Sequence, residues 1–145
     1  MSSESFDWKA ALREVDDERK IRNLLAHLSH LADHGTIDEY LALWTPDGIW
    51  EGSADSACGH EQLRARIERY RDRGVQGPRT GTRHVSTTRS VNFVSCDAAE
   101  CESYFIYFTQ VYSEPRVTTV GRYVDRLVRA DGRWRLARRR IVLDD

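Results

Sequence analysis

The sequence lacks the features of a membrane-spanning, exported or nucleotide-binding protein. No apolar run approaches the roughly 18 residues that a transmembrane helix needs. Residues 1–5 contain no basic segment followed by an apolar core, so we expect no signal peptide. A glycine-rich phosphate-binding loop and a dinucleotide fingerprint are also missing. These absences argue against an integral membrane protein and a nucleotide-dependent enzyme.

Cysteine is scarce in this chain. Its three cysteines, Cys58, Cys96 and Cys101, are an odd number, and their spacing is unlike that of a metal site. We interpret them as free thiols, either buried or at the surface, in a reducing compartment. The cysteine content therefore predicts a cytoplasmic location.

An excess of charge of either sign is missing as well. The chain has 22 Lys and Arg against 23 Asp and Glu, a formal net charge of -1. It therefore has no overall field that would attract nucleic acid or an anionic membrane, and we expect neither as a partner. The one basic run is Arg138–Arg140, which we interpret as solvated side chains on a strand, balanced by Asp144 and Asp145.

The composition that is present describes a globular protein. Apolar residues make up 40% and charged residues 31% of the 145 residues. A chain of this length can bury one core and a pocket. We predict a single domain over residues 1–145, with residues 1–5 frayed.

The first third of the chain has helical periodicity. Asp7 can cap a short helix, and a longer amphipathic helix follows that Gly35 ends. Thr36 and Glu39 have the spacing of a capping box, which predicts another short helix carrying Trp44 on its inner side. The elements expected next are a turn at 45–48, a short strand at 49–52, a loop at 53–59, a helix from about 60 to 73 and a flexible connection at 74–81.

From residue 82 the pattern changes to strands. Four segments rich in β-branched and aromatic residues are separated by turn signals, and the Asp131-Gly132 pair marks a hairpin. Helices followed by consecutive antiparallel strands indicate an α+β domain with helices on one face of a curved sheet. One strand, residues 99–108, becomes apolar on both sides towards its end, which favours burial against a second subunit. We therefore predict a homodimer or a higher homo-oligomer.

Asp33 and His84 are the residues best suited to acid–base chemistry. Asp33 lies at the end of the amphipathic helix, and His84 opens the first long strand. A carboxylate that accepts one ring N–H fixes the tautomer of a histidine, whose other nitrogen can then act as a base near neutral pH. A structural ion pair of Asp33 with Arg83 or Arg122 is the alternative that the sequence leaves open.

Five short segments follow one another in a distinctive order: Ala32-Asp33, Trp44-Thr45-Pro46-Asp47-Gly48-Ile49-Trp50, Arg83-His84, Gly121-Arg122-Tyr123-Val124-Asp125 and Asp131-Gly132-Arg133-Trp134-Arg135-Leu136. Over about residues 10–143 the chain thereby resembles the SnoaL-like branch of the NTF2-like superfamily, with its scytalone dehydratase-like dehydratases, dehydrochlorinases and polyketide cyclases. The resemblance implies an α+β cone, in which a strongly curved mixed or antiparallel sheet wraps around about three N-terminal helices and encloses a pocket.

The resemblance also implies a set of site residues. Asp33 and His84 fall where the dehydratases have their catalytic Asp–His dyad, and Tyr123 lies on a strand that faces the pocket. Scytalone dehydratase-like proteins have an amide at the position of Tyr123 and a tyrosine at that of Ala32, so this chain departs from them at two polar positions. The expected substrate-binding residues are Trp44, Trp50, Phe105 and Tyr107.

This set predicts a cofactor-independent lyase or isomerase, dehydratase-like, that acts on a hydrophobic molecule containing a ring. His84 would remove a proton next to a carbonyl or a leaving group, and Tyr123 would be its polar partner. Such a reaction needs no cofactor. Two alternatives stay open: a non-catalytic protein that binds small molecules, and a structural partner resembling the β subunit of ring-hydroxylating dioxygenases.

Two further chemistries are compatible with the residues but are less favoured. His30 and His34 lie four apart on one helix face, a spacing that metal sites use, yet helical His pairs are commonly solvated, and we expect no metal. Cys101 could be a nucleophile, but the spacing of the sequence sets no base beside it. We interpret Cys101 as a buried thiol.

Overall fold

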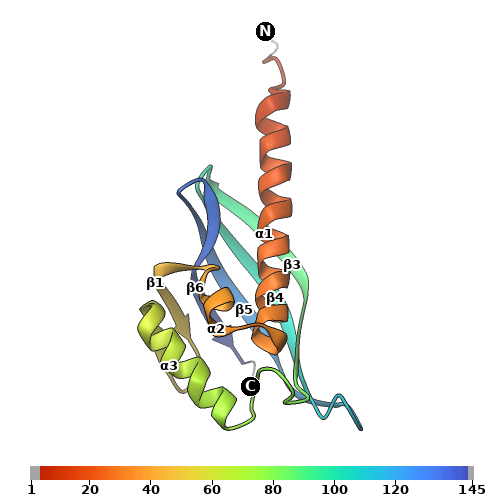
Figure 1. Ribbon diagram of the computed structural model, residues 1–145. Coiled ribbons are helices and arrows are strands. Elements are labelled where there is room, and N and C mark those ends of the chain that lie inside the picture. The colour runs from red at the N-terminus through yellow and green to blue at the C-terminus, as the bar shows by residue number, and fades with distance from the viewer. Residues whose placement is uncertain (1–3, 144–145) are drawn as a thin grey trace.

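The structure is a computed structural model and describes residues 4–143 of the 145-residue chain (Figure 1). Of the segment expected to be frayed, residues 1–3 lie outside the described residues. In chain order the elements are α1 (Trp8–His34), α2 (Ile37–Leu41), β1 (Trp44–Glu51), β2 (Ser56–Cys58), α3 (Gly59–Asp72), β3 (Arg83–Ser95), β4 (Ala98–Thr109), β5 (Arg116–Ala130) and β6 (Arg133–Val142).

Helix α1 is continuous, whereas the sequence pattern predicts two helices in this region. Its N-terminus is capped by Asp7, whose carboxylate accepts the backbone N–H groups of Lys9 and Ala10 at 3.0 and 3.1 Å. No glycine or proline lies between this cap and Gly35, so nothing ends the first helical pattern before the second begins. The first turns of α1 project beyond the sheet (Figure 1).

The segment around α2 confirms the capping box and corrects the elements after it. Thr36 Oγ1 accepts the backbone N–H of Glu39 at 3.2 Å, and the Glu39 carboxylate accepts that of Thr36 at 2.9 Å. Helix α2 is only five residues long, so Trp44 begins β1 instead of extending the helix. The turn expected at 45–48 is an irregularity within β1, whose pairing with β6 shifts between Trp44 and Ile49.

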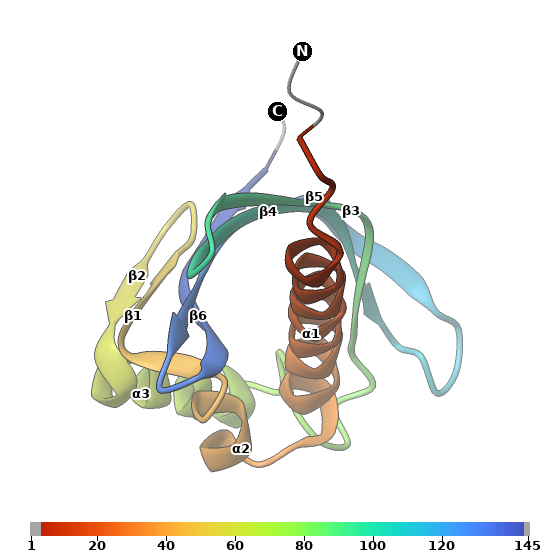
Figure 2. The same cartoon turned by 90° about the horizontal axis from the view of Figure 1, so that it is seen from above.

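The six strands form one mixed, strongly curved and unclosed sheet in the order β2-β1-β6-β5-β4-β3. Strands β3 to β6 are antiparallel neighbours, as predicted, and β1 joins β6 in parallel. Strand β2, in the segment expected to be a loop, pairs with β1. Figure 2 shows the sheet arching around α1, with α2 and α3 on the open side of the arch. The predicted α+β class and the curved sheet are confirmed.

The core lies between the concave face of the sheet and the helices. The centre of the apolar stripe of α1 is buried there, with Ile21 and Leu25 at 0% and Leu28 at 1% exposure. Helix α3 packs on β1 and contributes Leu63 and Ile67. Within residues 4–143, no helix is long and apolar enough to cross a membrane.

A buried carboxylate joins α1 to the last hairpin. Asp17 accepts hydrogen bonds from Trp134 Nε1 at 3.0 Å and from Arg129 Nη2 at 2.6 Å. The Arg129 guanidinium also lies 4.8 Å from the centre of the Trp134 ring. Burial alone would raise the pKa of Asp17, but the hydrogen bonds from Arg129 and Trp134 outweigh it and hold the pKa below its usual value. The ionised carboxylate therefore stabilises the packing of helix on sheet.

Replacing Asp17 with Asn should lower the free energy of unfolding at neutral pH by about 1–3 kcal/mol, because hydrogen bonds to a charged acceptor are lost. Since folding lowers the pKa of Asp17, its stabilising contribution is present above the unfolded-state pKa of about 4 and is lost as the pH falls through the folded-state value. Urea unfolding at neutral pH and in acid measures this difference.

The matched control is Asp16→Asn, which removes exposed ion pairs with Arg19 and Lys20 and should change stability little. An equal loss of stability in both variants at neutral pH would contradict the role of Asp17. So would a loss in Asp17→Asn that persists undiminished in acid.

Candidate functional site

The Asp33 carboxylate and the His84 imidazole are in direct contact. Asp33 Oδ1 lies 2.7 Å from His84 Nδ1, and Asp33 Oδ2 accepts the backbone N–H of His84 at 3.0 Å. Asp33 itself is only 3% exposed. A carboxylate has no proton to donate and acts only as an acceptor. The contact therefore assigns the ring proton of a neutral His84 to Nδ1 and leaves Nε2 as the acceptor. The sequence alone leaves open whether Asp33 and His84 meet; in the structure they are hydrogen-bonded.

The two arginines that could have paired with Asp33 make other hydrogen bonds. Arg83 Nη1 donates to the carbonyl oxygen of Thr82 at 2.6 Å. Arg122 Nη1 donates to the carboxylate of Glu102 at 2.6 Å. The structure thus brings His84, rather than Arg83, against the carboxylate of Asp33.

The pair is positioned by the end of one element and the start of another. Asp33 lies in the last turn of α1, which Gly35 ends, and His84 is the second residue of β3. His84 pairs in register with Tyr107 of β4, and their ring centres are 5.0 Å apart. The Tyr107 hydroxyl donates to the carbonyl oxygen of Val75, which holds the connection between α3 and β3 beside the pair.

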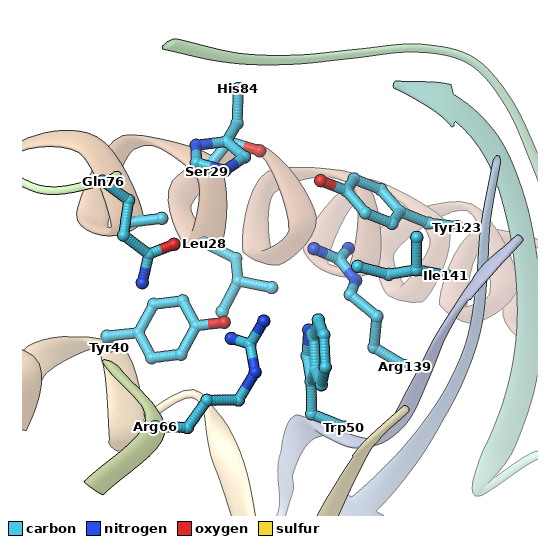
Figure 3. Close-up of a pocket in the computed structure, with 11 residues that line it drawn as sticks. Leu28, Ser29, Tyr40, Trp50, Arg66, Gln76, His84, Tyr123, Arg139 and Ile141 are labelled. Atoms are coloured by element: carbon cyan, nitrogen blue, oxygen red, sulfur yellow. The ribbon is translucent and has the colours of Figure 1, made fainter. Parts of the chain in front are cut away.

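A cavity lies next to His84, between α1, α3 and the concave face of the sheet (Figure 3). It consists of an inner chamber of about 80 Å³ and an outer chamber of about 230 Å³. Leu28, Ser29, Ala32, Tyr40 and Arg139 line the inner chamber alone. Residues common to both chambers are Trp50, Arg66, Gln76, His84, Tyr123 and Ile141.

Three of the four aromatic residues expected to bind substrate line this cavity, and one does not. Trp50 lines both chambers, while Phe105 and Tyr107 line the outer one. Trp44 is 1% exposed and packs in the core, 6.1 Å from the ring of Tyr40. Because α2 ends early and Trp44 opens β1, its side chain joins the hydrophobic core and lines neither chamber. The expectation that Trp44 lines the pocket is not met.

Tyr123 brings a protonated phenol to the cavity. Its ring is stacked on Phe105 at a centroid distance of 4.4 Å, and Arg139 Cζ lies 3.8 Å from its centre. Burial is the main effect and raises the pKa of Tyr123 far above that of an exposed phenol. The hydroxyl, directed toward the side of the cavity that holds His84 (Figure 3), is therefore a hydrogen-bond donor at neutral pH.

Arg139 is a site residue that is not among those expected from the sequence. It is 5% exposed, and its Nε and Nη2 each donate to the Asp125 carboxylate at 2.8 Å. Burial would lower the pKa of Arg139, but Asp125 outweighs burial and raises it. Interpreting Arg138–Arg140 as solvated is wrong for Arg139, because the pairing of β6 with β5 shifts at Ala137. The sequence feature that could have identified Arg139 is Asp125, a carboxylate on the inward face of β5 that needs a positively charged partner.

Arg66 of α3 is the second such residue. Its side chain is 12% exposed, and its guanidinium lies 3.2 Å from the centre of the Trp50 ring and 4.3 Å from that of Tyr70. Burial lowers the pKa of Arg66. Because Arg66 follows Leu63 by three positions, helical periodicity sets it on the inner face of α3, and this signal could have found it.

The other chemistries considered from the sequence find no geometric support. Cys101 is 2% exposed, and burial raises the pKa of its thiol to about 12, so the nucleophilic thiolate does not form at neutral pH. His30 and His34 are exposed on α1. Over residues 4–143, no three His, Cys, Asp or Glu side chains are grouped so that they could hold a metal ion.

Solved structures share this fold. An NTF2-like protein with a cystatin-like fold from Novosphingobium aromaticivorans has a TM-score of 0.86 at 25% identity, covering 99% of this chain and 93% of that one. A protein of unknown function from Nostoc punctiforme, also with a cystatin-like fold, has a TM-score of 0.77 at 26% identity, covering 88% and 91%. A proposed scytalone dehydratase from N. aromaticivorans has a TM-score of 0.73 at 20% identity, covering 93% and 89%; this likeness concerns the fold alone.

No curated protein matches the sequence. The sequence profile of the SnoaL-like domain, however, matches residues 13–140, which is nearly the whole chain and includes Asp33, His84, Tyr123 and Arg139. Together with the curved sheet and its NTF2-like structural neighbours, this match shows that the chain belongs to the SnoaL-like family.

Proposed function

We propose that this SnoaL-like protein is a cofactor-independent lyase or isomerase, dehydratase-like, in which Asp33 and His84 form an acid–base dyad. The observation that carries the proposal is the 2.7 Å contact between Asp33 Oδ1 and His84 Nδ1 beside a cavity that His84 lines. SnoaL-like and NTF2-like proteins include isomerases, dehydratases and non-catalytic members, so the fold alone does not name the reaction. The short contact between Asp33 and His84 beside the cavity favours a catalytic protein over a non-catalytic one.

In this proposal His84 Nε2 is the base. It takes a proton from a carbon next to a carbonyl group, and the electron pair of the broken C–H bond forms an enolate. Asp33 holds the Nδ1–H and stabilises the imidazolium. In an elimination, the enolate expels a β-hydroxyl group as the C–O bond breaks, and the imidazolium proton leaves with it as water. In an isomerisation, the imidazolium returns the proton to another carbon.

The polar groups around the dyad suit the charge that develops in such a step. Tyr123, protonated at neutral pH, can donate a hydrogen bond to the carbonyl or leaving oxygen. Arg139, held by two hydrogen bonds to Asp125, brings a positive charge to the inner chamber. Donors fixed before the reaction stabilise an enolate without reorganising. The walls formed by Trp50 and Phe105 are apolar and flat, which favours a substrate containing a ring.

We also propose that the protein forms a homodimer or higher homo-oligomer through the patch of Val85, Tyr104, Ile106 and Val120 on the outer face of β3, β4 and β5. Ile106 of β4 pairs in register with Val85 on one side and Val120 on the other. Val85 is 42% and Val120 58% exposed, and the adjacent Tyr104 is 50% exposed. A contiguous exposed apolar patch of this kind is typical of an interface. A second copy of the chain is the occupant we propose.

The dyad can be tested with 3-hydroxy-1-tetralone, which loses water to give 1-naphthol once its C2 proton is removed. The protein should accelerate 1-naphthol formation and, in D₂O, exchange of the C2 hydrogens. His84→Ala and Asp33→Asn should each lower these rates by about 10²–10⁴-fold, the usual contribution of a positioned general base. Naphthol fluorescence and proton NMR measure the two reactions.

The matched control is His30→Ala, which removes an exposed histidine from the same helix that carries Asp33 and should leave both rates unchanged. The catalytic dyad would be refuted if the wild-type protein accelerated neither reaction over buffer, or if His84→Ala had the same rates as the wild-type protein. If 3-hydroxy-1-tetralone binds equally well to all variants without turnover, the non-catalytic binding protein is the correct alternative.

The interface can be tested by light scattering after gel filtration at micromolar concentration. Wild-type protein should have at least twice the mass of one chain, and Ile106→Glu should give monomers because it buries a charge in the proposed contact. Val94→Glu changes an exposed residue (57%) near the other end of β3 and should leave the mass unchanged. A monomeric wild-type protein refutes the interface.

A further inference from the structure

We infer that the cavity binds a ring compound that carries a carboxylate, and that Arg66 binds this carboxylate while His84 faces the ring. The inference rests on the proposed function in that it takes this cavity to be the substrate site, and it specifies the class of substrate. It does not depend on whether the dyad performs catalysis.

Arg66 presents a flat cation to the inside of the cavity. Figure 3 shows its guanidinium between the Tyr40 hydroxyl and the Trp50 ring. The distance of 3.2 Å from Cζ to the centre of the Trp50 ring is that of a stacked cation, and the Tyr70 ring lies at 4.3 Å. Stacking fixes the plane of the guanidinium, whose N–H groups then form a fork that matches the two oxygens of a carboxylate.

The charge of Arg66 is poorly compensated within the chain. Arg139, the other arginine of the cavity, donates two hydrogen bonds of 2.8 Å to Asp125. Arg66 instead has Asp55, whose Oδ2 lies 3.4 Å from Nε, and among the described residues this buried Nε has no hydrogen-bond partner. Asp55 also lies 4.0 Å from Arg69 and is one-third exposed. Asp55 is therefore a loose and shared counterion.

Arg66 is the cation of the cavity lining that has only a loose carboxylate partner, because the charge of Arg139 is matched by Asp125. Arg66 and Arg139 both line the inner chamber, and among the described residues of the two chambers Asp55 is the only carboxylate. Burial lowers the pKa of Arg66, which means that its surroundings disfavour the cation. A bound anion would offset this desolvation, whereas a cationic ligand would increase the repulsion.

The position of Arg66 relative to the dyad defines how such a ligand lies. Arg66, Trp50 and His84 each line both chambers, so one molecule in the cavity can contact all three. A carboxylate on Arg66 places the attached ring against Trp50 and toward His84. Asp55 occupies the side of Arg66 in the outer chamber and would be displaced as the counterion when the ligand enters.

The test compares 2-naphthoate with 2-naphthamide, which have the same rings but differ in charge, by isothermal titration calorimetry. Wild-type protein should bind the carboxylate at least about tenfold more tightly than the amide, as expected for a hydrogen-bonded ion pair. Arg66→Gln should abolish this preference, and Arg66→Lys, which keeps the charge but not the fork, should keep part of it. Asp55→Asn should tighten 2-naphthoate binding, because it removes a competing carboxylate.

Arg69→Gln is the matched control, since Arg69 lies on the same helix with a side chain that is 56% exposed, and it should keep the preference. His84→Ala should keep the preference too, even where it abolishes 1-naphthol formation, so the inference and the proposed catalysis can fail separately. Equal affinity of wild-type protein for the two probes, or no binding of 2-naphthoate at millimolar concentration, overturns the inference. A preference that survives Arg66→Gln or disappears in His84→Ala overturns it as well.

Discussion

The two hydrogen bonds that the Asp33 carboxylate accepts from residue 84 hold the cavity end of the molecule together. One comes from the backbone N–H and the other from Nδ1 of the ring, across 51 positions of sequence. A buried carboxylate is costly unless it is hydrogen-bonded, so the end of α1, the start of β3 and the orientation of the imidazole are set together. The remaining cavity residues are arranged around this fixed pair.

Register shifts decide which side chains face the interior. In β3 the pairing with β4 shifts near Thr88, whose φ of 50° is unusual for a β-branched residue, and Arg89 then donates to Ser86 Oγ at 2.6 Å. In β6 the shift at Ala137 turns Arg139 inward. Each shift is followed within two residues by an arginine that hydrogen-bonds to another side chain, Ser86 for Arg89 and Asp125 for Arg139. Among the described residues the buried charged groups are Asp17, Asp33, Asp125 and Arg139, and the buried arginine is matched by Asp125.

Much of the fold follows from local sequence. The caps at Asp7 and Thr36, the stop at Gly35 and the four long strands are set by residues a few positions apart, and the structure has them where the pattern predicts. The residue types of the proposed dyad are also visible in the sequence, because a family resemblance marks their positions. Three features differ from expectation: α1 is unbroken because no glycine or proline interrupts it, whereas strand β2 and the place of Trp44 depend on strand pairing.

The sequence by itself determined the α+β class and the four long strands, and its family resemblance marked the candidates Asp33, His84 and Tyr123. Only the tertiary structure decided that Asp33 meets His84, and that Arg66 and Arg139 line the cavity. The physical reason is that alternation along a strand predicts a face only while the register is unbroken. One extra residue in β6 exchanges the inward and outward arginines, and that residue is recognised only when the neighbouring strands are paired.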